Sequence, residues 1–326
     1  MIGFRAWVLR ALASGVFGGG AASRLPILMY HRVMERPDPM MPDMPDVTFV
    51  DDQFEIMRRV FTVLPLEEAV ELLAAGRLPP RAACITFDDG YRDNYDVALP
   101  LLKRHGLSAT FFVASGFVDG GRMFNDTVIE AVRRLPSAAL DLTGWGIGQF
   151  ALSDLASRAR AADRIVAGIK YFKPELRDRF CDELAAKVGE PLPDDLMMSS
   201  EQVRDMAAKG MSIGGHTVTH PILTEIELPA ARDELLRDRE ALSAMVGKAP
   251  TCFAYPNGKP GSDYVRDHVD LVMQCGYRSA VCTAWGIPSQ STDRYQLPRF
   301  GPFDRVPEML VARTMRMAMR PTVKLV

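Results

Sequence analysis

Short apolar runs alternate with amphipathic segments along most of the chain. Strand-like apolar runs lie at 25–30, 82–87, 109–113 and 251–255, and helix-like segments with apolar residues three and four apart separate them. Strands of a parallel sheet are buried on both faces, so they read as continuous apolar runs. The pattern therefore predicts an α/β fold in which helices cover a parallel sheet.

Further strands are expected at 61–64, 211–214 and 277–282, with a late one at 296–300. A total of seven or eight strands favours a distorted (β/α) barrel of about seven strands over a small open sheet. In such a barrel, the residues directly after the strands form the active site. The covering helices are expected at 52–59, 66–75, 95–105, 199–209, 229–246 and 263–274.

Residues from about 120 to 196 break this alternation, because no convincing strand is found there. Helices are expected at 127–135, 154–172 and 175–188. We expect a helical insertion over one end of the barrel, either as scaffold or as a lid that contacts substrate. Residues 25–326 would form the barrel with its insertion, and residues 1–24 an N-terminal extension.

The N-terminal extension combines apolar and small residues with two arginines. Arg10 and the glycines at 18–20 interrupt the continuous apolar run that a signal peptide needs. We expect a short amphipathic helix in this extension, which includes Arg5 and Arg10 and lies on the barrel or on a membrane surface. No stretch of about 18 uncharged apolar residues occurs in the sequence, so no spanning helix is expected.

The composition excludes several classes of protein. Of the 326 residues, 48% are hydrophobic and 25% charged, which indicates a globular chain. The 39 Lys+Arg residues balance 41 Asp+Glu without a long block of one sign, so nucleic acid is not an expected partner. The five cysteines form no CxxC pair and are expected to be buried hydrophobes. They suit a reducing compartment, and we expect a cytoplasmic or membrane-peripheral location rather than secretion.

Two short motifs carry the strongest chemical signal. Asp88 and Asp89 follow a predicted strand and precede a glycine, so both carboxylates can reach one site at the strand end. His216 and His220 lie in the loop after another strand, and two imidazoles at this spacing can close on one cation. Two histidines and one carboxylate leave a coordination position open for water, and the other carboxylate fits a general base. An ordinary Asp-Asp-Gly turn is the alternative for the first motif.

Two weaker signals lie at other strand ends. The sequence FAYPNG at 253–258 is a strand that runs into a turn. We expect Tyr255 and Asn257 there to contact substrate, with a backbone N–H near Asn257 available to an oxyanion. His31 ends the first strand, within LMYHRV at 28–33. A structural turn and a structural histidine are the alternatives.

These motifs resemble those of a known family. TFDDG at 86–90, HTVTH at 216–220 and the YPNG turn at 255–258 are similar, in this order, to the motifs of the polysaccharide deacetylase (NodB-like) family of carbohydrate esterases. The resemblance covers about residues 26–300. The YHRV segment at 30–33 is similar to the branch that includes poly-N-acetylglucosamine deacetylases. The resemblance implies a distorted β/α barrel that hydrolyses the N-acetyl groups of amino sugars, usually in polymers.

The resemblance also implies roles for the first two motifs. Asp88 would be the general base, and Asp89, His216 and His220 would bind one divalent metal ion, for which we expect Zn²⁺. The expected partner is an N-acetylated carbohydrate, in a polysaccharide or a glycolipid. The residues leave two other functions open: another amide hydrolase on the same barrel, and a catalytically silent carbohydrate-binding protein.

The third motif departs from the family pattern at two positions. Ala254 stands where many members have an arginine that tethers the base, and Asn257 stands where an aromatic residue is common. We expect Arg299, in the late strand, to reach Asp88 from a neighbouring barrel position and to orient it as a guanidinium fork. The alternative is that Arg299 is an ordinary surface arginine.

His31 is expected to supply the general acid. Members of the family commonly take it from a late Leu-x-His motif, but no histidine follows His268. His268 lies within a predicted helix, and His105 ends another helix and is expected to face solvent. The first and last strands of a closed barrel are neighbours, so His31 can occupy the space of that late histidine. The alternative is that the His31 ring pins the loop after Tyr30.

Overall fold

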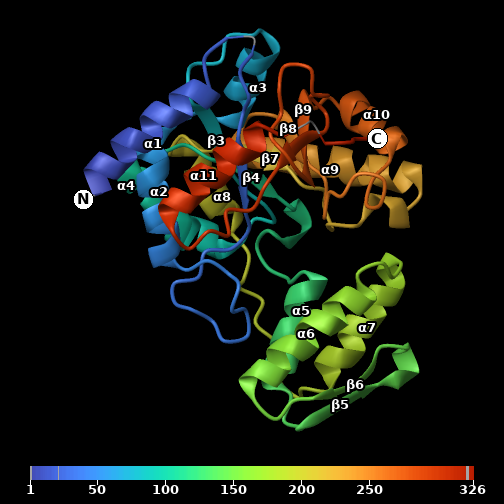
Figure 1. Cartoon of the computed structure of the whole chain (residues 1–326). Helices are drawn as coiled ribbons and strands as arrows, with labels where there is room; N and C mark the ends of the chain where they lie inside the picture. Colours follow the sequence, from blue (N-terminus) through green and yellow to red (C-terminus); the bar gives the residue numbers. More distant parts are fainter. Residues whose placement is uncertain (1, 21, 321–322) are drawn as a thin grey trace.

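The computed structural model describes residues 2–20, 22–320 and 323–326. At its centre is a parallel sheet in the order β1–β3–β4–β7–β8–β9–β10, curled into a barrel with helices outside (Figure 1). A short strand, β2, pairs with the start of β3. The strands are β1 (Ile27–Tyr30), β2 (Thr62–Val63), β3 (Ala82–Phe87), β4 (Thr110–Val113), β7 (Ser212–Gly215), β8 (Cys252–Ala254), β9 (Ser279–Trp285) and β10 (Leu297–Arg299).

A single bridge joins the last strand of the barrel to the first. The Met29 N–H donates to the Phe300 carbonyl at 3.0 Å, and the Phe300 N–H donates to the Ile27 carbonyl at 3.2 Å. The register of β10 against β9 shifts between Leu297 and Arg299. The closure is therefore irregular, and the prediction of a distorted (β/α) barrel of about seven strands is confirmed.

Most helices around the barrel lie close to the predicted positions, but the helix at Pro307–Ala318 was not predicted. The largest boundary difference arises because Asp46 caps its helix, with its carboxylate accepting the Phe49 N–H, so that this helix begins at Val47 rather than residue 52. These helices are α1 (Ile2–Val16), α2 (Val47–Val60), α3 (Leu66–Ala74), α4 (Leu99–His105), α8 (Ser200–Ala208), α9 (Leu228–Val246), α10 (Arg266–Gln274) and α11 (Pro307–Ala318).

The side chains of β3 alternate between the barrel interior and the helix layer. Cys84 belongs to the interior apolar cluster, whereas Ile85 and Phe87 pack under α2 and α4. Thr86 therefore points inward above Cys84, and Asp88 follows it on the same side. The interior is apolar at the amino ends of the strands and polar at their carboxyl ends, which prepares one end of the barrel for chemistry.

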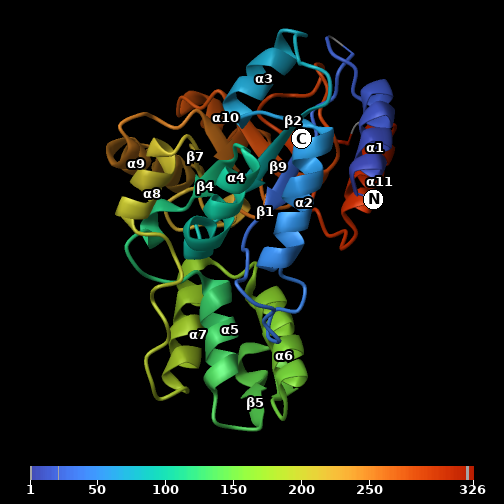
Figure 2. The same ribbon diagram turned by 90° about the vertical axis from the view of Figure 1, so that its left-hand side faces the viewer.

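The insertion forms a separate lobe beyond the carboxyl ends of the strands (Figures 1 and 2). Its members are α5 (Phe124–Arg134), α6 (Leu155–Ile169), α7 (Pro174–Ala186), β5 (Ala139–Leu142) and β6 (Gly148–Ala151). It has a hydrophobic core of its own. The expectation that it contains no strand is wrong, because β5 and β6 pair in an antiparallel hairpin. Only Leu140, Leu142 and Phe150 of this hairpin face the core, which is too short an alternation to detect.

The N-terminal extension contains the expected helix. Helix α1 contacts α2 and α11 on the outside of the barrel (Figure 2). Among the described residues, no helix is long and apolar enough to cross a membrane. All five cysteines are buried and unpaired, as expected.

The close approach of β7 to β4 gives a first prediction. A Cβ on Gly214 would overlap the Phe112 ring and lie 3.1 Å from the Cys252 carbonyl oxygen. We expect Gly214→Ala to lower the free energy of unfolding by about 1–3 kcal/mol, the usual cost of overpacking. Urea unfolding followed by circular dichroism measures it. Gly144→Ala is the control, because a Cβ there meets nothing within 4 Å, and equal stability of both variants would contradict the prediction.

Candidate active site

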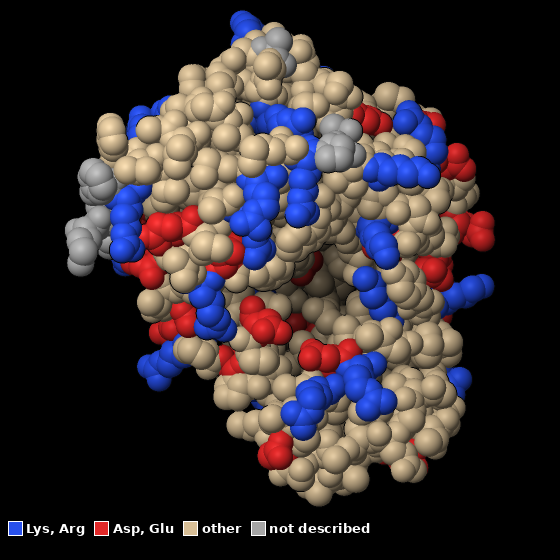
Figure 3. All heavy atoms as spheres, in the orientation of Figure 1, with Lys and Arg blue, Asp and Glu red and all other residues tan. Residues whose placement is uncertain are grey.

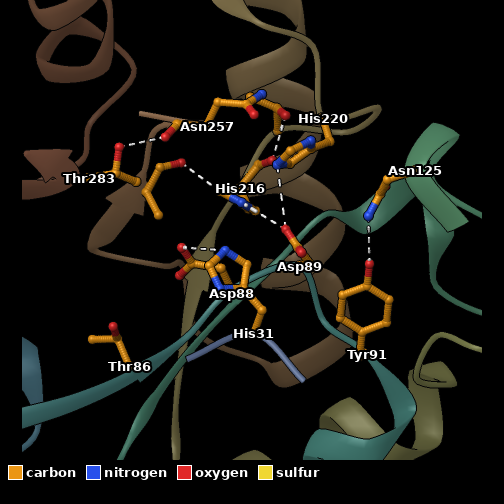
Figure 4. Close-up of polar contacts among 12 residues, drawn as sticks. His31, Thr86, Asp88, Asp89, Tyr91, Asn125, His216, His220, Asn257 and Thr283 are labelled. Carbon is orange, nitrogen blue, oxygen red and sulfur yellow. Dashed lines mark hydrogen bonds and ion pairs between the residues drawn. The ribbon is translucent and has the colours of Figure 1, made fainter. Parts of the chain in front are cut away.

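Most of the predicted site residues meet at the carboxyl ends of the strands (Figure 4). Asp88 and Asp89 follow β3, the two histidines of HTVTH follow β7, and Asn257 follows β8. His31 follows β1, beside β10. Residues separated by more than two hundred positions in the sequence thus surround one point, because parallel strands end at the same edge of the barrel.

Arg299 binds Asp88 through a buried, two-pronged ion pair. Both terminal guanidinium nitrogens donate to the Asp88 carboxylate, each at 2.7 Å. Arg299 is fully buried, and Asp88 is 2% exposed. The same guanidinium also donates to the Thr86 hydroxyl at 3.0 Å and to the Cys282 carbonyl at 3.3 Å. The structure therefore places Arg299 where a base-tethering arginine is needed, and not on the surface.

This pairing keeps the Asp88 carboxylate charged. Burial alone raises the pKa of a carboxyl group, but the Arg299 guanidinium outweighs burial and holds the pKa of Asp88 below its usual value. Since both carboxylate oxygens accept from one planar group, their orientation is also fixed. An oriented, ionised carboxylate is what a general base requires.

Asp89, His216 and His220 form a compact cluster beside this base. The Asp89 Oδ1 atom lies 3.3 Å from the Nε2 atom of His216 and 3.4 Å from that of His220. One ligand atom from each residue lies within 4.8 Å of the other two. Burial lowers the pKa of His220 to about 3, so its ring is neutral. Burial raises the pKa of Asp89, but the hydrogen bond from His216 and the nearby histidine charges outweigh burial and lower this pKa.

The cluster fits a divalent cation. The His216 Nδ1 atom lies 2.7 Å from the Ala254 carbonyl oxygen, which can only accept, so Nδ1 carries a hydrogen. Nε2 faces the cluster and has a lone pair for a cation once it releases the proton that it shares with Asp89. The Nδ1 atom of His220 is buried without a hydrogen-bond partner among the described residues. Two imidazoles and a carboxylate are also a common donor set for Zn²⁺ and related ions.

Two acidic residues of α9 hold the HTVTH loop, and sequence reasoning missed both. Asp238 is fully buried and accepts the backbone N–H of His216 at 2.9 Å and of Ser115 at 3.1 Å. Glu234 accepts the N–H groups of Val218 and Thr219, each at 2.8 Å. They are four residues apart and share one helix face, but acidic residues on a covering helix normally face solvent.

The backbone is strained where the site is built. Six non-glycine residues of the described chain have positive φ, and four of them belong to the motifs. These four are Asp89 (φ 79°), Thr217 (φ 65°), His220 (φ 53°) and Asn257 (φ 57°). Such conformations cost of order 1–3 kcal/mol each and persist only where surrounding contacts enforce them.

His31 lies at the edge of the site. Its Nε2 atom is 3.9 Å from the Asp88 Oδ2 atom, and its side chain is 42% exposed. Its backbone carbonyl accepts from the Asn94 side chain at 2.7 Å. Within the described chain, its ring makes no hydrogen bond to backbone, so the ring does not pin the loop after Tyr30.

The other two histidines lie outside the site. The expectation that His105 faces solvent is wrong, because its ring packs between Asp51, at 2.7 Å, and Glu55, at 3.3 Å, of α2. His268 lies within a helix, as predicted, in the first turn of α10, where its Nδ1 atom accepts the Val265 N–H at 3.1 Å. Neither ring reaches the motifs.

The prediction that Tyr255 binds substrate is wrong. Tyr255 is 1% exposed, its ring stacks on Tyr264 at 3.9 Å, and its hydroxyl donates to the Tyr295 carbonyl. Alternation along β8 explains this, since Ala254 faces the barrel interior and its neighbour must face the helix layer. Asn257 does lie on the side of the two histidines (Figure 4), with its Nδ2 atom buried and unpartnered among the described residues.

A cavity of about 640 Å³ opens above the site, between barrel and insertion. Figure 3 shows it as a hollow between the two lobes, with acidic side chains around it. Its lining includes His31, Arg32, Asp89, Tyr91, Asp126 and Phe303. The insertion thus forms one wall of the cavity.

That wall carries a polar group that sequence reasoning missed. The Tyr91 hydroxyl donates to the Asp126 carboxylate at 3.1 Å and accepts from the Asn125 amide at 3.2 Å. The Arg32 guanidinium lies 4.6 Å from the centre of the Tyr91 ring. Burial raises the pKa of Asp126 to about 7 even though Arg32 lies nearby. Tyr91 directly follows the Asp-Asp-Gly motif, and this position in the sequence could have identified it as a residue near the site.

Fold and site together define a (β/α)-barrel hydrolase with a tethered carboxylate beside a carboxylate–imidazole cluster. The polysaccharide deacetylase family model matches residues 75–280. The chain belongs to this family, as its motifs indicated, and it is therefore an N-deacetylase that acts on polysaccharide. The match includes both carboxylates and both cluster histidines, whereas Arg299 lies beyond it.

Several known proteins are similar to this chain. YxkH of Bacillus subtilis, assigned to the polysaccharide deacetylases, is 21% identical over 283 residues, which are 85% of this chain and 71% of YxkH. The solved structure of the Streptococcus pyogenes deacetylase PplD, in complex with acetate, aligns with a TM-score of 0.61 at 20% identity, over 92% of this chain and all of PplD. IcaB from Ammonifex degensii aligns with a TM-score of 0.56 at 18% identity, over 93% of this chain and 99% of IcaB. At these identities the structures support the fold.

The buried ion pair gives the second prediction. We expect Arg299→Met to lower the free energy of unfolding by about 3–5 kcal/mol, because it leaves Asp88 charged and buried without a partner. Adding Asp88→Asn to this variant removes that charge and should restore part of the loss. Urea unfolding measures all of these changes.

The matched control is Arg313→Met. Arg313 pairs with Asp304 at 2.8 Å but is 32% exposed, so we expect a loss below about 1 kcal/mol. An Arg299→Met variant no less stable than Arg313→Met would contradict the prediction.

Proposed function

We propose that this protein is a metal-dependent hydrolase that removes N-acetyl groups from amino sugars in a polysaccharide or a glycolipid. One observation carries the proposal. The Asp88 carboxylate, held by Arg299, stands beside the Asp89–His216–His220 cluster, and Asp89 lines an open cavity. Amide hydrolysis needs a base and an electrophilic centre side by side, and this arrangement offers both.

Asp89, His216 and His220 would hold one divalent ion, and this donor set favours Zn²⁺. When bound, such an ion polarises the acetyl carbonyl and lowers the pKa of a coordinated water. The chain fixes the three ligands through Ala254, which orients His216, and through Asp238, which holds the loop.

Asp88 would accept the proton of the attacking water, with Arg299 keeping its carboxylate ionised and oriented. His31 would donate a proton to the leaving amine. Its ring lines the cavity, lies 3.9 Å from the base and is exposed enough to exchange protons with solvent. A backbone N–H in the turn at Asn257 would stabilise the oxyanion.

The cavity supports a sugar substrate. Its volume of about 640 Å³ is typical of small-molecule sites. Its lining offers the Tyr91 hydroxyl of the barrel and the Asn125 amide and Asp126 carboxylate of the insertion, which are groups that bind sugar hydroxyls. The structure of PplD was obtained with acetate, which is the acid that deacetylation releases.

Acetate release tests this function. The panel contains chitin oligomers, poly-N-acetylglucosamine, peptidoglycan and lipid-linked N-acetylated amino sugars, with the Asp88→Asn protein as blank. Release above the blank from any of them supports the proposal. Release only from small non-sugar amides would indicate another amide hydrolase. Binding of sugar without release from any substrate would indicate a silent carbohydrate-binding protein.

The cluster predicts the metal content. Protein purified without chelator should contain about one divalent ion, expected to be Zn²⁺, per chain, and His216→Ala should lose most of it because one of three ligands is gone. Elemental analysis measures the content. His105→Ala is the control, since His105 ends α4 and packs against Asp51 of α2, away from the cluster. A metal content in the His216→Ala protein equal to that of the wild type would contradict the assignment of His216 as a metal ligand.

The two adjacent carboxylates predict opposite phenotypes. Asp88→Asn should keep the metal and lose about 10²–10⁴ in rate, the usual contribution of a general base. Asp89→Asn should instead lose metal affinity. Each variant serves as the control of the other in paired assays of metal content and acetate release. Near wild-type activity of Asp88→Asn would show that the two roles are misassigned.

The general acid gives the last prediction of this section. His31→Gln should lower the rate by about 10²–10⁴ while the melting temperature and metal content stay unchanged, because glutamine keeps polarity but cannot donate a proton in this pH range. Rate, thermal unfolding and elemental analysis are measured on the same protein. A rate equal to that of the wild type, or a variant that unfolds, would contradict the general-acid role and indicate that His31 is a structural residue.

A further inference from the structure

Helix α1 also exposes large apolar side chains on its outer side. Ala6 and Ala13 are buried, and Leu9 and Val16 pack partly buried against the same core, whereas Trp7 is 66% exposed, Leu12 55% and Val8 36%. The inward face is the usual apolar face of a surface helix, but the outward face is apolar as well. The fold of the barrel does not account for this outward apolar face.

The exposed apolar residues form one continuous face. At 100° per residue, positions 7, 8, 11, 12 and 15 share one side of α1, and all of them are uncharged. Helix α11 lies beside α1 (Figures 1 and 2) and adds exposed methionines, Met309 at 48% and Met319 at 72%. Contiguous exposed apolar patches mark interaction sites.

The charges around this face are mostly positive. Helix α1 has no acidic residue, and its two charged residues, Arg5 and Arg10, border the apolar face. Glu308 of α11 lies 3.6 Å from Arg5, whose side chain remains 67% exposed. The adjoining end of α11 contributes the exposed Arg316 and Arg320. Figure 3 shows Lys and Arg side chains over α11, with some acidic side chains beside them. Arginines at the edge of an apolar face place their stems along it and their guanidinium groups toward anionic head groups.

We infer that the outward face of α1, with the adjoining exposed side of α11, docks on a membrane surface rich in anionic lipid. The helix lies along the barrel wall and is too short and too interrupted by arginine to span a bilayer, so it would lie in the plane of the interface. Charge complementarity favours an anionic lipid surface over a second copy of this chain, because the arginines of two such copies would face and repel one another.

Docking would bring the cavity rim to the lipid surface. Phe303 lines the cavity, is 61% exposed and precedes α11. Its ring stacks on Trp285, and the Trp285 ring lies close to Arg313 of α11. A substrate carried at the membrane could then enter without leaving it. This consequence rests on the proposed function, whereas the docking itself does not.

Co-sedimentation with lipid vesicles tests docking without measuring any activity. Wild-type protein should bind vesicles of phosphatidylcholine mixed with phosphatidylglycerol more strongly than vesicles of phosphatidylcholine alone. The Trp7→Ser/Leu12→Ser variant should bind the vesicles at least about tenfold more weakly than the wild type, because it removes most of the inserted apolar area. Arg5→Glu/Arg10→Glu should abolish the preference for the anionic vesicles.

Leu155→Ser/Leu176→Ser is the matched control. These leucines are exposed at 50% and 42% on the insertion, so the variant removes similar apolar area elsewhere and should bind as the wild type does. The inference is overturned if wild-type protein fails to sediment, or if the Trp7→Ser/Leu12→Ser variant binds equally well. It is also overturned if the wild type is a dimer by light scattering that this variant converts to a monomer.

Discussion

The buried pair between Asp88 and Arg299 is the interaction on which the rest of the structure depends. It connects the end of β3 to β10, the last strand of the barrel, and the Thr86 hydroxyl extends it by accepting from Arg299 and donating to the Leu28 carbonyl of β1. Three strands are thereby linked inside the barrel at the point where, among the described residues, a single backbone bridge joins β10 to β1. A buried charge pair is tolerated only when every partner is satisfied, and here both oxygens and all three guanidinium nitrogens have partners.

This pair also explains how the site can lack the arginine that its third motif would normally carry. Ala254 leaves space in the barrel interior, and its backbone carbonyl orients His216 instead. The base is held from the other side of the barrel, by a strand that comes 211 residues later in the chain. The same chemical requirement, a cation beside the base, is thus met from a different strand.

The metal cluster and the base are supported in different ways. Arg299 holds Asp88 through a charged contact, whereas the histidine loop is held through backbone N–H groups that donate to Glu234 and Asp238 of α9. Three of the four strained motif residues belong to the cluster or its loop, namely Asp89, Thr217 and His220. Contacts to α9 enforce this loop geometry, which places both imidazoles on one carboxylate. The helix layer therefore takes part in building the site as well as covering the sheet.

The sequence by itself determined the barrel, the order of its strands along the chain, and the residues of the two main motifs. Apolar runs report burial directly, and the motifs Asp-Asp-Gly and His-x-x-x-His are local in the sequence. Both kinds of signal can therefore be recognised without knowledge of the fold. It also allowed Arg299 and His31 to be singled out, because barrel closure makes the first and last strands neighbours. Only the tertiary structure decided that Tyr255 faces the helix layer, that Asp126 of the insertion lines the cavity, and that Glu234 and Asp238 hold the loop. These depend on which side of a strand or helix meets its neighbour, and that is settled by packing between distant segments and not by any local pattern.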